Sequence, residues 1–105
     1  MPLTVLGQLR RRSCAATLLA PLALAAQEPP SPAIGRALYA EHCERCHGVD
    51  LVYAGMSFDL RTFPQDQPER FKRSVAQGTR AMPAWGKRLT PGQIESLWLY
   101  VSAAR

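Results

Sequence analysis

The sequence predicts a small all-α fold of three to four short helices joined by loops. The clearest sign is an apolar stripe near the carboxyl end, where side chains recur at the i, i+3, i+4 and i+7 spacing of one helix face: Ile94, Leu97, Trp98 and Val101. No stretch shows the alternation of apolar and polar residues that is typical of a half-buried strand. At 105 residues the chain has room for one small domain.

The first 26 residues predict a signal peptide that is cleaved on export. Three arginines at 10–12 precede an apolar run over 14–26, and the small residues Ala23 and Ala25 fit a cleavage signal. The run is too short to cross a bilayer, which takes about 20 apolar residues. We therefore expect a periplasmic protein without a stable membrane anchor; an uncleaved amino-terminal anchor is the alternative.

The first helix is predicted directly behind a flexible, proline-rich lead-in at 27–32, and the domain itself over 33–105. Ser31 is a candidate N-cap with a proline at the first helical position, and apolar residues at helical spacing follow. This helix should end near Gly48. From 49 to 64 the apolar residues follow neither the 3.6-residue period of a helix nor the two-residue period of a strand, which predicts a loop.

Two further helices are expected in the second half of the chain. Asp66 is the expected cap of a short helix that Gly78 ends, and 79–89 should form another loop. The last helix has the best-defined start, because Thr90 and Gln93 form a capping box. It should bury the apolar stripe.

The pentapeptide Cys43-Glu44-Arg45-Cys46-His47 carries the most specific chemistry in the sequence. Two cysteines three apart lie on one side of a helical turn, so their sulfurs can reach the two vinyl groups of one porphyrin. His47 can then face the iron as an axial ligand. The motif predicts one covalently bound haem c, attached through Cys43 and Cys46.

Two other interpretations of the pentapeptide have less support. A thioredoxin-like redox pair needs a βαβ context, and nothing upstream has a strand pattern. A structural zinc site needs four converging ligands, but only His42 and Cys14 remain outside the pentapeptide. Covalent haem would also supply the apolar surface that a chain of this length needs for a core.

Charge argues against nucleic acid as a partner. The chain carries 13 Lys+Arg and 8 Asp+Glu, but removal of the three leader arginines lowers the formal charge from +5 to +2. No basic stripe with interleaved aromatic residues is present in the sequence. We expect a monomer that meets other redox proteins, and the candidate residues of a surface for an acidic partner are Lys72, Arg73, Arg80, Lys87 and Arg88.

The second axial ligand is a choice between two methionines, because Met1 belongs to the leader. Met82 lies far enough along the chain to reach the opposite face of the ring. Met56 is nine residues beyond His47, a distance that an extended chain also spans. Geometry alone leaves both open, and a methionine can also simply fill a gap in a core.

Four segments together resemble the class I cytochromes c: Gly35-x-x-x-Tyr39, Cys43-x-x-Cys46-His47-Gly48, Met82-Pro83-x-Trp85-Gly86 and Leu97-Trp98-x-Tyr100-Val101. The resemblance covers essentially the whole domain and implies the small cytochrome c fold around one covalently bound haem. It implies Met82 as the iron ligand, since the ligand methionine of that family is commonly followed by proline. It also implies that the first and last helices cross near Gly35 and Tyr39.

The chain departs from that family at one point. Many members have a Gly-Pro pair after the haem motif whose carbonyl orients the axial histidine, whereas this chain has Tyr53-Ala54-Gly55 there. The hydrogen-bond partner of His47 is therefore not predicted. By analogy with related proteins, Arg61 and Trp85 are candidate contacts for the haem propionates; a solvated Arg and a core Trp are the alternatives.

A narrower resemblance concerns residues 58–64 and the Met82 loop, which are similar to small cytochromes that accept electrons from periplasmic quinoprotein alcohol dehydrogenases. We expect an electron carrier, not an enzyme, that passes one electron from a dehydrogenase to a terminal oxidase or another cytochrome. Its thioether ligand favours a fairly high potential. The alternatives are a haem enzyme or gas sensor with an open iron position, and a haem-bearing subunit of a larger dehydrogenase complex.

Overall fold

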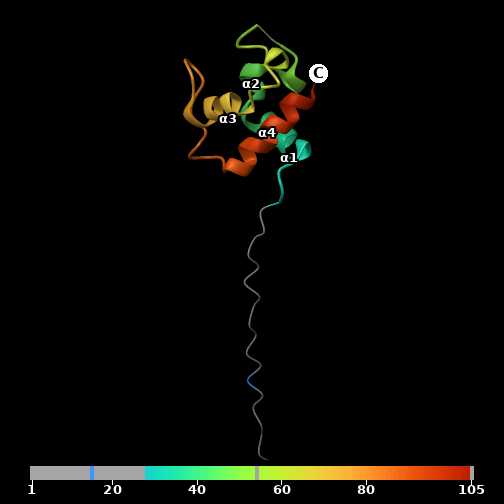
Figure 1. The fold of residues 1–105 in the computed structure, drawn as a ribbon, viewed down its shortest axis with the longest axis vertical. Helices are drawn as coiled ribbons and strands as arrows, with labels where there is room; N and C mark the ends of the chain where they lie inside the picture. The colour runs from blue at the N-terminus through green and yellow to red at the C-terminus, as the bar shows by residue number, and fades with distance from the viewer. Residues whose placement is uncertain (1–14, 16–27, 54, 105) are drawn as a thin grey trace, which may run out of the picture.

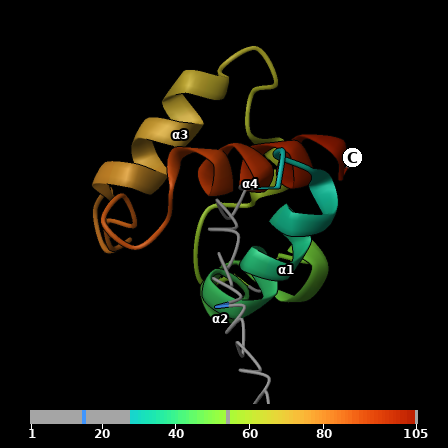
Figure 2. The ribbon, with the colours of Figure 1, turned by 90° about the horizontal axis from the view of Figure 1, so that it is seen from below.

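Four α-helices and two short 3₁₀ helices form the part of the chain that the computed structural model describes, residues 15, 28–53 and 55–104. In chain order they are α1 (Pro32–His42), α2 (Glu44–His47), η1 (Val49–Leu51), η2 (Leu60–Thr62), α3 (Pro68–Gln77) and α4 (Pro91–Ala103). These residues contain no strand, only one isolated bridge between Thr79 and Met82. The all-α prediction is confirmed. In Figures 1 and 2, α4 lies between α1 and α3.

The predicted signal peptide, residues 1–26, lies outside the described residues apart from Ala15. Within the described part of the chain, no helix combines the length and the apolar character needed to cross a membrane.

Each of the three longer helices begins with a proline, and the residue before that proline is the N-cap. Ser31 Oγ accepts a hydrogen bond from the Ile34 amide at 3.2 Å, as predicted for α1. Thr90 and Gln93 form the predicted capping box of α4, with bonds of 3.1 Å and 2.8 Å. The prediction of Asp66 as the cap of α3 is wrong, because the cap is Gln67, and its side chain makes no capping bond.

Two other expectations need refinement. The first helix does not run unbroken to Gly48, because Cys43, at φ −113° and ψ −28°, separates α1 from the single turn α2. The segment 49–64 was expected as a loop and contains both 3₁₀ helices. In η1 the buried Leu51 has φ +64°, a left-handed conformation that is costly for a branched side chain.

The crossing of α1 and α4 fixes the frame of the molecule. A Cβ atom added at Gly35 would lie 1.9 Å from the backbone oxygen of Ser96, so only glycine allows the two helices to approach this closely. One turn further along α1, the Tyr39 and Tyr100 rings are 5.4 Å apart. The crossing near Gly35 and Tyr39 is therefore confirmed.

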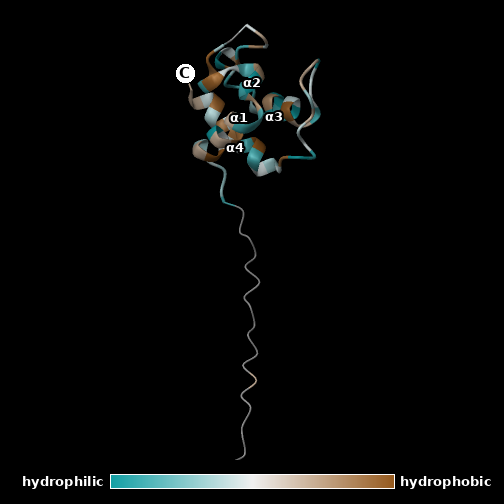
Figure 3. Ribbon diagram, turned by 180° about the vertical axis from the view of Figure 1, so that it is seen from behind, coloured by the Kyte–Doolittle hydropathy of each residue, from teal (hydrophilic) through white to brown (hydrophobic). Residues whose placement is uncertain are grey.

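The core lies along the inner side of α4. All four residues of the predicted stripe are buried: Ile94, Leu97, Trp98 and Val101. Phe63 and Phe71 complete an aromatic cluster with Trp98, with ring centroids between 5.2 and 6.0 Å apart. Figure 3 shows apolar and polar residues mixed along the helices, as expected for elements with one buried face. The cluster anchors α3 and the chain after η2 to α4.

Replacement of Gly35 by alanine should lower the free energy of unfolding by about 1–3 kcal/mol, because the new methyl group meets backbone of α4 and the helices must separate. Chemical denaturation of the haem-loaded protein measures the change. Gly92→Ala is the matched control: its Cβ would lie 3.9 Å from its nearest neighbours, so stability should be unchanged or slightly higher. Equal stability of the two variants would contradict the close crossing.

Candidate functional site

An open, mainly apolar cavity of about 1000 Å³ lies between α2, the chain from 56 to 63, α3 and the Met82 loop. Its volume is at the upper end of the range for sites that bind organic ligands, about 300–1000 Å³. The apolar wall includes Leu60, Phe63, Phe71, Val75, Leu97 and Val101. Five of the six predicted site residues also line it: Cys43, Cys46, His47, Met82 and Trp85.

The two cysteines of the pentapeptide are free thiols at one side of this cavity. Burial, with a smaller effect of Cys46 nearby, raises the pKa of Cys43 to about 11. A dithiol redox site instead lowers the pKa of its attacking thiol, so the environment of Cys43 does not suit that chemistry. No cluster of three His, Cys, Asp or Glu side chains suited to a metal ion occurs among the described residues.

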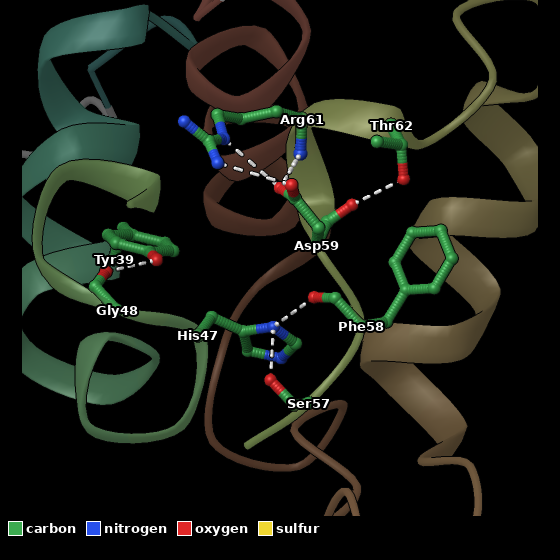
Figure 4. Close-up of polar contacts among 8 residues, drawn as sticks. All are labelled: Tyr39, His47, Gly48, Ser57, Phe58, Asp59, Arg61 and Thr62. Carbon is green, nitrogen blue, oxygen red and sulfur yellow. Dashed lines mark hydrogen bonds and ion pairs between the residues drawn. The ribbon is translucent and has the colours of Figure 1, made fainter. Parts of the chain in front are cut away.

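His47 is the last residue of α2, and its ring is held from one side. Nδ1 lies 3.2 Å from the backbone oxygen of Phe58 and 3.0 Å from Oγ of Ser57 (Figure 4). A carbonyl oxygen only accepts, so the bond to Phe58 requires the proton on Nδ1. Within the described residues Nε2 has no hydrogen bond. In the neutral form of the ring, Nε2 is then a free lone pair in a residue that lines the cavity.

Ser57 and Phe58 are the partners of His47 that the sequence did not predict. They follow the Tyr53-Ala54-Gly55 segment that stands where related proteins have Gly-Pro. A backbone carbonyl still accepts from His47, but it comes from a residue further along the chain. No local pattern singles out that carbonyl, because every residue in the loop has one.

Tyr39 links the frame of the fold to the end of the pentapeptide. Its hydroxyl donates to the backbone oxygen of Gly48 at 2.5 Å, and the residue is 2% exposed. Burial raises the pKa of Tyr39 well above its ordinary value, so it stays a neutral donor. Gly48 has φ +94°, and a Cβ there would lie 1.8 Å from the Val52 oxygen. The helix crossing therefore determines where α2 ends.

The Met82 loop is tied to the carboxyl end of α3. Backbone bonds run from Trp85 to Val75 at 2.9 Å and from Gly86 to Ala76 at 3.0 Å. A further pair joins Thr79 and Met82, at 2.9 and 3.2 Å. Met82 is half-buried and packs against the core, whereas Met56 is 74% exposed. Both methionines line the cavity, but only Met82 lies in a segment held by this bonding pattern.

The two predicted propionate contacts differ in position. Trp85 is buried in the cavity wall, with its ring 4.8 Å from that of His42. The Arg88 guanidinium lies 5.4 Å from the centroid of the Trp85 ring. Arg61 is not among the cavity-lining residues, and its guanidinium binds the Asp59 carboxylate at 3.1 and 3.2 Å (Figure 4). Propionate binding by both residues stays a prediction.

The donor set fits a covalently held porphyrin. Two thiols one helical turn apart, an imidazole with Nε2 free and a thioether on a separate loop all line one cavity with apolar walls. A flat apolar ring fills such a space well, and the described lining residues include three arginines, Arg45, Arg70 and Arg80, but no Asp or Glu. The arrangement offers attachment and two axial ligands.

Comparisons with known proteins agree with this geometry. The family model described as cytochrome C oxidase, cbb3-type, subunit III matches residues 30–101. Cytochrome c6 of Gloeothece citriformis (strain PCC 7424) is 39% identical over 72 residues, which make up 64% of this chain and 66% of that protein. Quinohemoprotein alcohol dehydrogenase ADH IIB of Pseudomonas putida is 33% identical over 76 residues, 70% of this chain but only 11% of that enzyme.

A solved structure is similar in fold. Cytochrome c6 from the diatom Phaeodactylum tricornutum superposes with a TM-score of 0.57 over 70% of this chain and 92% of that one, at 23% identity. At this level of identity the likeness shows the fold alone.

Replacement of Tyr39 by phenylalanine should lower the free energy of unfolding by about 1–3 kcal/mol, because the buried Gly48 carbonyl loses its hydrogen bond. Tyr100→Phe is the control, since the Tyr100 hydroxyl makes no hydrogen bond within the described residues. It should change stability by less than about 0.5 kcal/mol. Denaturation curves that give both variants the same loss would show that the Tyr39 hydroxyl does not hold the end of α2.

Proposed function

The chain belongs to the c-type cytochrome family and binds haem c covalently, and from this premise we propose that it is an electron carrier, not an enzyme. The observation that carries the proposal is the placement of His47 and Met82 in the walls of one cavity. When haem is bound there, its iron supplies one-electron oxidation and reduction. With two protein groups holding the iron, no position on it would be left for a substrate.

The positions of the cavity residues support a separate role for each of them. Cys43 and Cys46 would attach the ring through thioether bonds, and His47 Nε2 and Met82 Sδ would hold the iron. The apolar wall excludes water, which tunes the potential. Trp85 remains a candidate propionate contact because it lies in the cavity wall beside His42. Arg61 has less support, because it does not line the cavity and two of its nitrogens already bind Asp59.

An enzyme or gas sensor is the less supported alternative. Such a site needs an acid, base or hydrogen-bond donor on the open side of the ring. The only other histidine of the sequence, His42, adjoins Cys43 and packs against Trp85 with the two rings tilted. It lies beside the attachment point, a poor position for a distal group.

The proposed partners are redox proteins, with a quinoprotein alcohol dehydrogenase as donor and an oxidase or another cytochrome as acceptor. Similarity to a cytochrome-sized part of two quinohemoprotein alcohol dehydrogenases supports the donor. The predicted signal peptide supports a periplasmic location. The alternative is a haem-bearing subunit of a larger complex, which would use the same chemistry but stay permanently bound to its partner. Size-exclusion chromatography under native conditions separates the two: elution of the chain only together with a large dehydrogenase would favour the subunit.

The chain from 70 to 88 supplies a basic surface beside the cavity. It contains six Lys and Arg residues and no Asp or Glu. Lys72 is neutralised by Glu69 at 2.7 Å and Glu95 at 2.9 Å, which removes it from the expected docking set. Arg70 and Arg80 line the cavity itself. This distribution supports an acidic partner surface that meets the protein near the haem edge.

Met82→Ala should remove the weak long-wavelength band that sulfur-to-iron charge transfer gives to ferric haem. It should also lower the reduction potential, because a thioether ligand favours ferrous iron. Visible spectra and an equilibrium redox titration of the haem-loaded variants measure both effects. Met56→Ala is the control and should match the wild type. Survival of the band in Met82→Ala, with its loss in Met56→Ala, would reverse the ligand assignment.

Reversal of charge in Arg80→Glu, Lys87→Glu should slow reduction by an acidic donor at low salt by about tenfold or more, because electrostatic steering is lost. The wild-type rate should fall with salt and approach that of the variant. Stopped-flow kinetics with the native donor measures the rates. Arg36→Glu is the control, since Arg36 lies on α1, pairs with Asp50 and does not line the cavity. A larger effect of Arg36→Glu would place docking on another face.

A further inference from the structure

Ser57 stands against the histidine that the proposed function assigns to the iron. Its Oγ lies 3.0 Å from His47 Nδ1 and 2.7 Å from the backbone oxygen of Cys46. The carbonyl oxygen of Phe58 lies 3.2 Å from the same Nδ1. Figure 4 shows the two dashed contacts meeting at one nitrogen of the imidazole ring. One ring nitrogen therefore has two oxygen partners, and one of them is a side chain.

The hydrogen-bond directions of these groups determine one another. A hydroxyl has one proton to donate, and the Cys46 carbonyl can only accept, so Ser57 donates to Cys46. Toward His47, Ser57 Oγ can then only accept a hydrogen bond from Nδ1–H. If Nε2 ligates iron, the proton of the neutral ring is on Nδ1, which suits both Ser57 Oγ and Phe58 O. The Nδ1 proton is shared between the hydroxyl and the carbonyl.

We propose that Ser57 is a positioning residue for the axial histidine. This inference rests on the proposed function, because it takes His47 as the iron ligand. By accepting part of the Nδ1 proton, the hydroxyl raises the electron density of the imidazole and stabilises ferric iron. By donating to Cys46, it also fixes the ring relative to the backbone that carries the attachment point. The chain thus sets the ring orientation with one carbonyl and one hydroxyl where it lacks the Gly-Pro pair.

The position of Ser57 determines what the loss of its hydroxyl should do. The residue is half-buried, and its backbone lies in the same loop as Phe58. Loss of the hydroxyl leaves the Phe58 carbonyl as the remaining acceptor, so His47 keeps its tautomer and its ligand role. The potential should then shift while ligation persists.

The test compares Ser57→Ala with the pair Ser57→Thr and Ser57→Val in the haem-loaded protein. Ala and Val should shift the ferric–ferrous equilibrium constant toward ferrous by about two- to tenfold, the effect of one ordinary hydrogen bond, whereas Thr retains the hydroxyl and should stay near the wild type. Equilibrium redox titration gives the constant. NMR of the ferrous protein gives the His47 Nδ1–H resonance, which should move in Ala and Val.

Thr62→Val is the matched control, because Thr62 Oγ1 also donates to a backbone oxygen in this region, that of Asp59 at 2.7 Å, but does not touch His47. It should leave both readouts unchanged. If Ser57→Ala does not retain haem, the nearly isosteric Thr and Val variants carry the comparison. An unchanged potential and resonance in the hydroxyl-free variants would overturn the proposal while His47 ligation stands. Wild-type spectra without histidine ligation would instead overturn the proposed function.

Discussion

The structure depends on filling the large apolar cavity between α2, α3 and the Met82 loop. A chain of this size buries little apolar surface by itself, and several of its core residues also line this cavity: Phe63, Phe71, Val75, Leu97 and Val101. The family's covalently bound haem c meets that need. Folding and cofactor binding are therefore one thermodynamic event in this account.

The rest of the fold positions groups around the cavity through short connections. Gly35 lets α1 pack closely against α4. Four residues later on α1, Tyr39 donates a buried hydrogen bond to the Gly48 backbone oxygen and so fixes the position of Gly48 relative to the two helices. The end of α2 is thereby fixed, and His47 with it. On the other side, the carboxyl end of α3 bonds to Trp85 and Gly86 and holds the Met82 loop. Two rigid pairings thus set the distance between the proposed axial ligands.

Much of the fold was predictable because its signals are local. The caps of α1 and α4 follow from side chains within three residues of the helix start, and the apolar stripe of α4 follows from its period. The sequence contained a signal for the correct cap of α3. A residue before proline is kept out of the helical region, so Gln67, which precedes Pro68, was the better choice than Asp66.

The less predictable features depend on loop conformation. The hydrogen-bond partners of His47 lie ten and eleven residues further along the chain, in a segment without helix or strand periodicity. The sequence therefore does not predict which carbonyl of this segment reaches His47. Arg61 was assigned by analogy, and the nearby Asp59 engages it instead. The pentapeptide was predicted because its chemistry requires particular residue types, whereas the choice of Met82 came from the resemblance to class I cytochromes c. Contacts made by the backbone are not tied to a residue type, so the sequence does not reveal them.

The most direct test is the unfolding of the chain without its cofactor. The variant Cys43→Ala, Cys46→Ala, purified free of haem, is compared with the haem-loaded wild type by circular dichroism during thermal and chemical denaturation. We predict that the haem-free chain loses most of its helix signal and its cooperative transition, whereas the loaded protein unfolds in one sharp step. A haem-free chain with native helix content and a cooperative transition of similar midpoint would contradict the dependence of this fold on the filled cavity.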